Sequence, residues 1–224
     1  MRRAAAERML ADMTTSQTTS ETTHLRALAL VCSLKPSPAE SSSDLMARQV
    51  LEALAGHDVV GEVVRVVDHD VKPGVGKDMG DGDAWPALRE KVLAADVLVL
   101  ATPTWMGQAS SVCMRVLERL DAELSEKDEL GRPTVFGKVA VCAVVGNEDG
   151  AHHIASQVFQ ALNDVGYTIP AQGSTYWNGE AMHGTDYVDL DETPEATAGT
   201  NAMVAANAAH LARLLKAANF PGTG

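Results

Sequence analysis

Aromatic residues are scarce in this chain, at 4% of its 224 residues. A core therefore has to be built mainly from alanine, valine and leucine, as in parallel strands buried between helices. Positive charge is also in short supply, since 18 basic residues stand against 30 acidic ones and give a formal net charge of −12. Such a chain is a poor partner for a polyphosphate backbone, so we expect no nucleic-acid binding.

Long apolar runs and cysteine pairs are missing as well. No segment approaches the ~20 apolar residues that span a bilayer, and residues 1–13 lack the apolar stretch of a secretory signal. We therefore expect a cytoplasmic protein without membrane contact. The three cysteines, Cys32, Cys113 and Cys142, are odd in number and widely spaced, which predicts reduced, mostly buried thiols rather than a disulfide framework.

Hydrophobic residues make up 46% of the chain, enough for one sizeable core. Residues 1–24 end in a polar Thr/Ser tract that cannot bury enough apolar area to become ordered. We expect a disordered or loosely helical tail there, a single domain over 25–218, and a C-terminal tail over 219–224.

Apolar runs and helical periodicities alternate along the domain. Short buried strands are expected at 26–32, 59–67, 96–101 and 139–145, with a short fifth strand starting at Tyr167. Helices are expected at 44–56, 85–95, 109–124, 151–165 and 196–218. This alternation predicts an α/β fold, a doubly wound five-stranded parallel sheet with helices on both faces. Ligands of such a sheet bind beyond the carboxyl ends of the strands.

The loop after the first expected strand is rich in hydroxyls and leads into a helix. Serines and free amides at a helix N-terminus suit an anion such as a phosphate, because those N–H groups lack partners. The alternative is that residues 41–43 only cap the helix.

The loops after the third and fourth strands contain aromatic residues and glycines. Trp105 and Met106 stand beside Gly107, a combination that suits packing on a flat ring; the alternative is that Trp105 is local core. Gly146 and Gly150 permit close approach of the backbone to a ligand, although a strand-to-helix turn alone can also require glycine.

These three loops resemble those of the flavodoxin-like superfamily, specifically its NAD(P)H-dependent FMN reductase and flavodoxin-family oxidoreductase branch, over roughly residues 26–218. The run Pro103 to Gly107 matches that family's Pro-x-Tyr/Trp-x-Gly flavin loop, and residues 146–150 resemble the loop beside the pyrimidine side of the flavin. The resemblance implies strand order 2-1-3-4-5, non-covalent FMN, and a homodimer or homotetramer. The cofactor-binding residues it implies are Ser33, Lys35, Ser41, Ser43, Pro103, Thr104, Trp105, Met106, Gly107, Gly146, Asn147 and Gly150.

The activity implied by this resemblance is an FMN-dependent oxidoreductase. It would take hydride from NADH or NADPH and reduce a small acceptor such as a flavin, a quinone, or an azo or nitro compound, without a catalytic side chain. One alternative is a flavodoxin-type electron carrier without turnover of its own, although the Thr/Ser-x-Thr-Gly-x-Thr loop of flavodoxins is missing. Another is a module of this fold that binds no flavin.

Several other polar and aromatic residues of the chain are of types that can bind metals or ligands. His152 and His153 are adjacent, and neighbours on a helix point about 100° apart, so we expect no metal site. Glu148 and Asp149 either lie near the flavin ring or are solvated.

Tyr176, Trp177 and His183 belong to the long segment 172–194, which we expect to border the site or an oligomer contact. Two further motif classes are excluded: residues 74–78 lack the Walker A pattern and predict a mobile loop, and no Gly-x-Ser-x-Gly hydrolase motif occurs.

Overall fold

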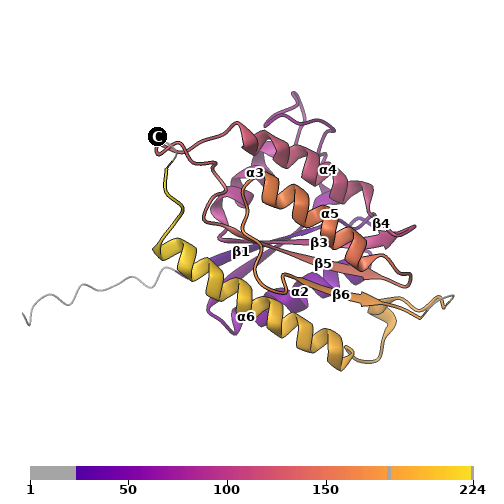
Figure 1. Cartoon of the computed structure of the whole chain (residues 1–224). Coiled ribbons are helices and arrows are strands. Elements are labelled where there is room, and N and C mark those ends of the chain that lie inside the picture. Colours follow the sequence, from indigo (N-terminus) through magenta and orange to yellow (C-terminus); the bar gives the residue numbers. More distant parts are fainter. Residues whose placement is uncertain (1–23, 181–182, 223–224) are drawn as a thin grey trace, which may run out of the picture.

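The computed structural model describes residues 24–180 and 183–222, drawn in Figure 1. The tail expected over residues 1–24 therefore lies almost wholly outside the described residues. At the other end, Phe220 of the expected C-terminal tail packs on the ring of Phe136, with ring centroids 5.4 Å apart. Arg132 also donates a hydrogen bond to the Phe220 carbonyl, so this part of the tail lies against the domain.

Five long parallel strands form the sheet, in the order β2-β1-β3-β5-β6. This confirms the order 2-1-3-4-5 implied by the resemblance, β5 and β6 being the fourth and fifth long strands. A two-residue strand, β4, pairs antiparallel with the end of β3. The bounds are β1 Leu25–Val31, β2 Val59–Arg65, β3 Val97–Trp105, β4 Gln108–Ala109, β5 Val139–Gly146 and β6 Ser174–Asn178.

Helices cover both faces of the sheet (Figure 1). Their bounds are α2 Ser42–Ala55, α3 Trp85–Ala94, α4 Ser111–Leu120, α5 Ala151–Asp164 and α6 Glu195–Ala217. Strand alternation divides the core in two: Leu28 and Leu30 of β1 belong to the cluster with α3, α4 and α5, whereas Ala29 and Val31 belong to the cluster with α2 and α6. Because β1 is buried on both faces, it has the continuous apolar sequence typical of a central parallel strand.

The fifth long strand lies later in the chain than the sequence predicted. Around Tyr167, only Thr168 forms an isolated bridge, to Val139. Pro170 has no N–H group and cannot continue a ladder of hydrogen bonds. Regular pairing with β5 begins at Ser174, so β6 falls inside the segment that the sequence assigned to a long loop.

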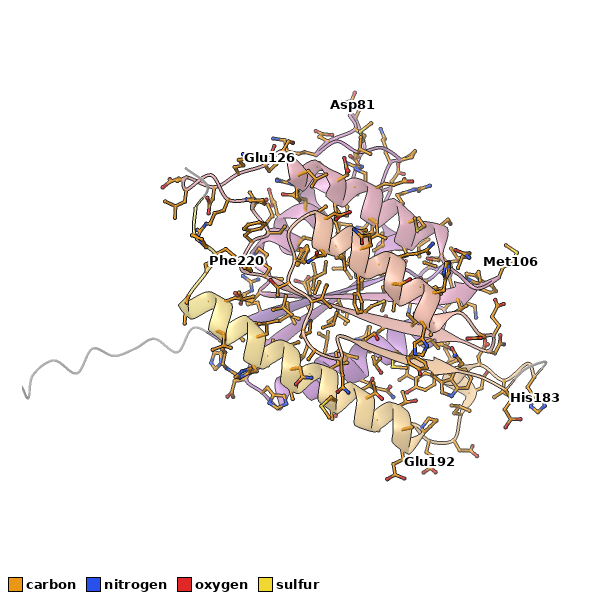
Figure 2. All side chains as sticks on the ribbon, in the orientation of Figure 1. Asp81, Met106, Glu126, His183, Glu192 and Phe220 are labelled. Carbon is orange, nitrogen blue, oxygen red and sulfur yellow. The ribbon has the colours of Figure 1, made fainter. Side chains whose placement is uncertain are left out.

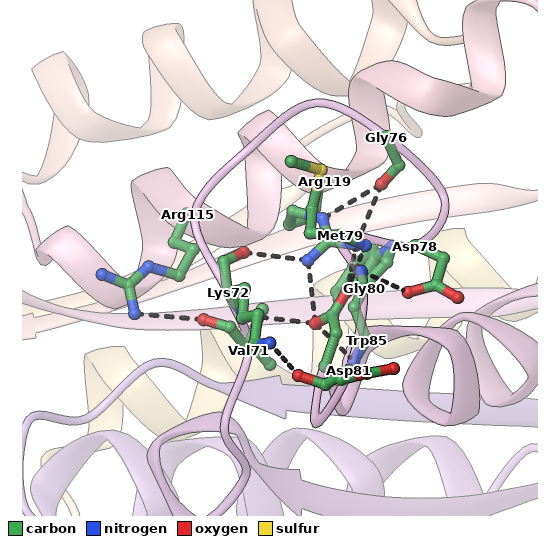
Figure 3. Close-up of polar contacts among 11 residues, drawn as sticks. Val71, Lys72, Gly76, Asp78, Met79, Gly80, Asp81, Trp85, Arg115 and Arg119 are labelled. Atoms are coloured by element: carbon green, nitrogen blue, oxygen red, sulfur yellow. Dashed lines mark hydrogen bonds and ion pairs between the residues drawn. The ribbon is translucent and has the colours of Figure 1, made fainter.

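The glycine-containing loop at 72–83 is also more firmly held than its sequence predicted. Arg119 of α4, whose side chain is fully buried, donates hydrogen bonds to the carbonyls of Lys72 and Gly76 (Figure 3). The same guanidinium forms a two-pronged ion pair with the buried carboxylate of Asp83, at 2.7 and 3.0 Å. Its carbon Cζ lies 5.5 Å from the centroid of the Trp85 ring. A buried side chain from another element thus fixes the shape of this loop.

Candidate functional site

The candidate site is a cleft of about 130 Å³ beyond the carboxyl ends of the strands. The loop after β1, the start of α2, the ends of β3 and β5 with Asn147, and residues of β6 and of the segment before α6 line it. Met106 and His183 project at this end of the molecule, and Phe220 lies at the other (Figure 2). The three loops selected from the sequence therefore converge, as the parallel topology requires.

Serines form the end of the cleft at the N-terminus of α2. Ser33, Ser41 and Ser43 line it and are all at least nine-tenths buried. The Ser41 hydroxyl also accepts a hydrogen bond from the Asp44 amide at 3.4 Å and so caps α2, which means that capping and lining coexist. The amides of Ser42 and Ser43 belong to the first helical turn, where the α-helical pattern supplies no acceptor. With Lys35, also in the lining, they give this end the donors and the positive potential that attract an anion.

The end of β3 supplies the apolar wall. Pro103, Thr104 and Trp105 line the cleft, and the Trp105 side chain is 51% exposed, which rules out the alternative that it is core filler. Met106 and Gly107 adopt positive φ angles of 52° and 73° in the turn between β3 and β4. These two residues do not line the cleft; they form the turn that supports Trp105.

The loop after β5 packs directly on this turn. Glu148 accepts a hydrogen bond from the Met106 amide at 2.7 Å. Gly150 touches the turn so closely that a Cβ atom there would lie 2.8 Å from the Cα of Gly107. Gly150 thus supports the site without lining it, and Glu148, which the sequence left open, is a hydrogen-bond partner of the turn. Gly146 and Asn147 do line the cleft.

Thr104 carries a buried polar atom that no group of the protein satisfies. Its side chain is 4% exposed, and its Oγ1 has no hydrogen-bond partner among the described residues. Gly146 lies against it, and a Cβ atom at position 146 would be 2.6 Å from the Thr104 Cβ. A buried hydroxyl without a partner is costly, and this one is on a residue that lines the cleft, so a ligand with a polar rim fits there.

The opposite wall comes from segment 172–194, which the sequence predicted to border the site or an oligomer contact, although it did not single out two of the lining residues. Asp186 and Tyr187, just before α6, line the cleft beside Trp177. The ring centroids of Trp177 and Tyr187 are 5.4 Å apart, and Asp186 accepts a hydrogen bond from the Asn147 side-chain amide at 3.2 Å. The length of the segment was the signal for a role at the site, but no local pattern marks residues 186 and 187, because their place in the cleft depends on tertiary folding.

Two side chains of α2 hold this wall in place. The Tyr187 hydroxyl donates a hydrogen bond to Gln49 Oε1 at 2.7 Å, and Gln49 Nε2 donates one to the Thr193 hydroxyl at 2.8 Å. The Val188 amide donates to the hydroxyl of Ser42 at 3.2 Å. Burial raises the pKa of Tyr187 further above neutral, and its phenol is a protonated donor at pH 7.

Strand alternation separates the two neighbouring aromatic residues of β6. Trp177 faces the cleft, whereas Tyr176 packs edge-on against His152, with ring centroids 5.0 Å apart. His153 instead lies beside Gln108, its Nε2 being 3.2 Å from the amide oxygen. The two histidines thus have different neighbours. Over 24–180 and 183–222, no group of three or more His, Cys, Asp or Glu residues is arranged to hold a metal ion.

The three cysteines are buried and unpaired in the core. Burial raises the pKa values of Cys32 and Cys142 well above the ordinary value, so both remain thiols at neutral pH and are poor nucleophiles. They contribute apolar packing rather than chemistry to this end of the sheet.

Taken together, the cleft has the chemistry that FMN requires. Amide and hydroxyl donors at the start of α2 suit a phosphate, the exposed face of Trp105 and the ring of Trp177 suit a flat heterocycle, and the unsatisfied Thr104 hydroxyl suits a polar rim. No general acid or base is needed for hydride chemistry at a bound flavin.

Comparison with known proteins agrees with this assignment. The family model "NADPH-dependent FMN reductase" matches residues 25–182. The 8-demethyl-8-aminoriboflavin-5′-phosphate synthase of Streptomyces davaonensis is 34% identical over 208 residues, covering 86% of this chain and 79% of the synthase. The crystal structure of RosB with the bound intermediate 8-demethyl-8-formylriboflavin-5′-phosphate has a TM-score of 0.79 and 32% identity, covering 88% of this chain and 82% of RosB.

A further relative differs greatly in length. The divalent metal cation transporter MntH of Mycobacterium bovis is 39% identical over 200 residues, covering 86% of this chain. The chain spans 29% of the length of that transporter. In the part of this chain that the structure describes, no helix combines the length and apolar character needed to cross a bilayer.

Proposed function

The chain belongs to the NADPH-dependent FMN reductase family, and from this we propose that it is an FMN-binding oxidoreductase that uses NADH or NADPH to reduce a small acceptor. Candidate acceptors are a free flavin, a quinone, or an azo or nitro compound. Family membership implies FMN as the cofactor and NADPH as the reductant. The finer choices, the acceptor and the use of NADH, are part of the proposal.

The observation that carries the proposal is that different parts of the cleft differ in chemistry. Donors of the first turn of α2 lie at one end, and the indole of Trp105 lies on the β3 side. Ser33, Ser43 and Lys35 would hold the phosphate, while Trp105 and Trp177 would bind the ring system. Bound FMN supplies the capacity to accept hydride from a nicotinamide and to pass electrons on.

The protein's own contribution is binding, orientation and exclusion of water. The turn at 106–107 is fixed by Glu148 and by Gly150, so Trp105 is held at the mouth of the cleft. Asp186 and Tyr187 close the opposite wall and are themselves hydrogen-bonded to Asn147 and Gln49. A pre-formed cleft of this kind binds a planar ligand with little loss of conformational entropy.

Two measurements on the purified chain test the proposal. Titration with FMN is expected to quench flavin fluorescence and give a saturable binding curve, and steady-state oxidation of NADPH is expected once a flavin or quinone acceptor is added. Failure to bind FMN would favour the module without a cofactor. FMN binding with negligible turnover unless a separate reductase is supplied would favour the flavodoxin-type carrier.

A second candidate function is favoured by the two relatives named for riboflavin phosphates. In this alternative a flavin 5′-phosphate enters the same cleft as a substrate and leaves chemically changed. Mass spectrometry of the flavin recovered after incubation distinguishes the two. An unaltered FMN mass after many turnovers of NADPH supports the oxidoreductase, whereas a changed mass supports the flavin-modifying enzyme.

We also propose that the protein is a cytoplasmic homodimer or homotetramer, as the family resemblance implies. Light scattering of the purified protein at micromolar concentration measures its mass and tests the oligomeric state.

A further inference from the structure

Arg65, the last residue of β2, joins the two ends of the loop that follows β1. Its Nη1 donates hydrogen bonds to the carbonyl oxygens of Ala39 at 2.6 Å and Lys35 at 3.4 Å. Its Nη2 lies 3.4 Å from a carboxylate oxygen of Asp44, in the first turn of α2, and its side chain is only 10% exposed. One planar guanidinium therefore contacts the start of the loop, its end, and the helix that follows.

A second contact fixes the middle of the same loop. Asp68 accepts hydrogen bonds from the Ser37 amide at 2.7 Å and from the Ser37 hydroxyl at 2.6 Å. These bonds lower the pKa of Asp68, so its carboxylate is ionised at neutral pH. Ser37 is exposed and does not line the cleft, which means that Asp68 holds the tip of the loop away from the ligand.

The pattern of donors and acceptors shows what this arrangement achieves. A phosphate repels carbonyl oxygens and binds N–H and O–H donors. Arg65 engages the carbonyls of Lys35 and Ala39, while Ser33, Ser43 and the first turn of α2 are in the lining. Arg65 itself does not line the cleft, so it acts on a ligand only through the loop.

We propose that Arg65 is a positioning residue that makes the cleft selective for the 5′-phosphate of a flavin nucleotide. It holds the loop carbonyls away from the phosphate and keeps the serine donors directed at it. This role rests on the proposed binding of FMN. It goes beyond that function because it assigns phosphate selectivity to a side chain that does not touch the ligand.

The experiment compares FMN with riboflavin, which share the ring and the ribityl chain and differ in the phosphate. Both are titrated into the full chain carrying Arg65→Lys, which keeps the positive charge but loses the fork needed to hold two carbonyls and a carboxylate together. We expect FMN affinity to fall about tenfold and riboflavin affinity to change less than about twofold, because only the phosphate end is disturbed.

Arg48→Lys is the matched control. Arg48 pairs with the same Asp44 at 2.6 Å, but its side chain is 62% exposed, and it makes no hydrogen bond to the loop. Its replacement is expected to leave both affinities unchanged. If Arg65→Lys does not fold, Ser37→Ala provides the test through the second contact, with a smaller loss confined to FMN.

Several outcomes overturn this assignment. If Arg65→Lys weakens FMN and riboflavin equally, Arg65 serves only the stability of the domain. If Arg65→Lys changes neither affinity, the loop does not shape the phosphate end. A wild-type protein that binds riboflavin as tightly as FMN would show that the cleft has no phosphate site. Wild-type protein that binds neither flavin would instead refute the proposed function itself, and the assignment with it.

Discussion

Two loops of this protein are each held by one arginine, and the two arginines differ in where they lie. Arg119 is fully buried and holds the 72–83 loop, which does not line the cleft, with Asp83 as its buried partner. Arg65 retains 10% exposure and holds the loop that borders the cleft. The comparison separates two uses of the same side chain: one stabilises the domain, and the other shapes a binding surface. Variants at the two sites should therefore change different measured quantities.

The largest effect is expected from Asp83→Asn. The Asp83 carboxylate accepts hydrogen bonds from the amides of Lys72, Met79 and Trp85 in addition to Arg119. Loss of its charge leaves Arg119 buried without a counter-charge, which lowers the free energy of unfolding by about 3 kcal/mol or more. Urea denaturation at pH 7 measures this change. The ratio of FMN to riboflavin affinity should stay at the wild-type value in the folded variant.

Asp128→Asn is the control for that prediction. Asp128 pairs with Arg132 at 2.6 Å, but the two side chains are 33% and 19% exposed. Partly exposed pairs of this kind contribute about 0–1 kcal/mol, and asparagine at position 128 keeps an oxygen that can accept from the Leu130 and Arg132 amides. If Asp83→Asn and Asp128→Asn lower the free energy of unfolding equally, burial does not explain the stability that the Arg119–Asp83 pair contributes.

The same ion pair should make stability depend on pH in the acid range. Hydrogen bonds from Arg119 hold the pKa of Asp83 well below its ordinary value. A depressed carboxyl pKa stabilises the folded state fully above the unfolded value of ~3.9 and progressively less as pH falls below it. The difference in unfolding free energy between wild type and Asp83→Asn should therefore narrow progressively as the pH falls from about 4 to about 2. A difference that stays constant across this range would contradict the prediction.

The two loops also show which features of the structure the sequence alone predicts. Strands followed by polar loops predicted that Ser33, Trp105 and Gly146 would meet at one end of the sheet, because parallel topology places the strand ends together. The partners of Arg119 and Arg65 were not predictable, since the carboxylate of Asp83 lies 36 positions away from Arg119 and the contact depends on tertiary packing. For the same reason the sequence predicted a border role for segment 172–194 without singling out Asp186 and Tyr187.

The misplaced fifth strand has a local cause. The run beginning at Tyr167 has the β-branched and aromatic residues of a strand, yet Pro170 ends it after a single bridge. The true strand, β6, has the sequence Ser-Thr-Tyr-Trp-Asn, in which threonine, tyrosine and tryptophan favour strands. Pairing with β5 begins there, beyond the proline.

A smaller effect on the cleft is expected from Trp105→Ala. Because Trp105 would contact the ring and not the phosphate, its loss should weaken FMN and riboflavin equally, by about tenfold. The ratio of the two affinities, which Arg65→Lys is expected to change, should stay constant. Trp105→Phe keeps an aromatic face and should recover most of the affinity. Fluorescence titration of the wild type, Trp105→Ala and Trp105→Phe with each flavin measures these affinities. A loss confined to FMN binding in Trp105→Ala would place Trp105 at the phosphate end.

The smallest effect is expected at the wall opposite Trp105, with Gln49→Ala. Gln49 bridges the Tyr187 hydroxyl and the Thr193 hydroxyl, so its loss releases the segment before α6 without removing any residue from the cleft lining. Each lost hydrogen bond contributes about 1 kcal/mol to the stability of the wall. Because Gln49 does not touch the ligand, only part of this loss lowers the free energy of binding, so both flavins should bind a few-fold more weakly. Glu52→Ala, on the same helix but exposed, should change neither affinity. If Gln49→Ala also leaves both affinities unchanged while Arg65→Lys lowers that of FMN, only the loop after β1 controls binding, and the wall formed by Asp186 and Tyr187 is passive.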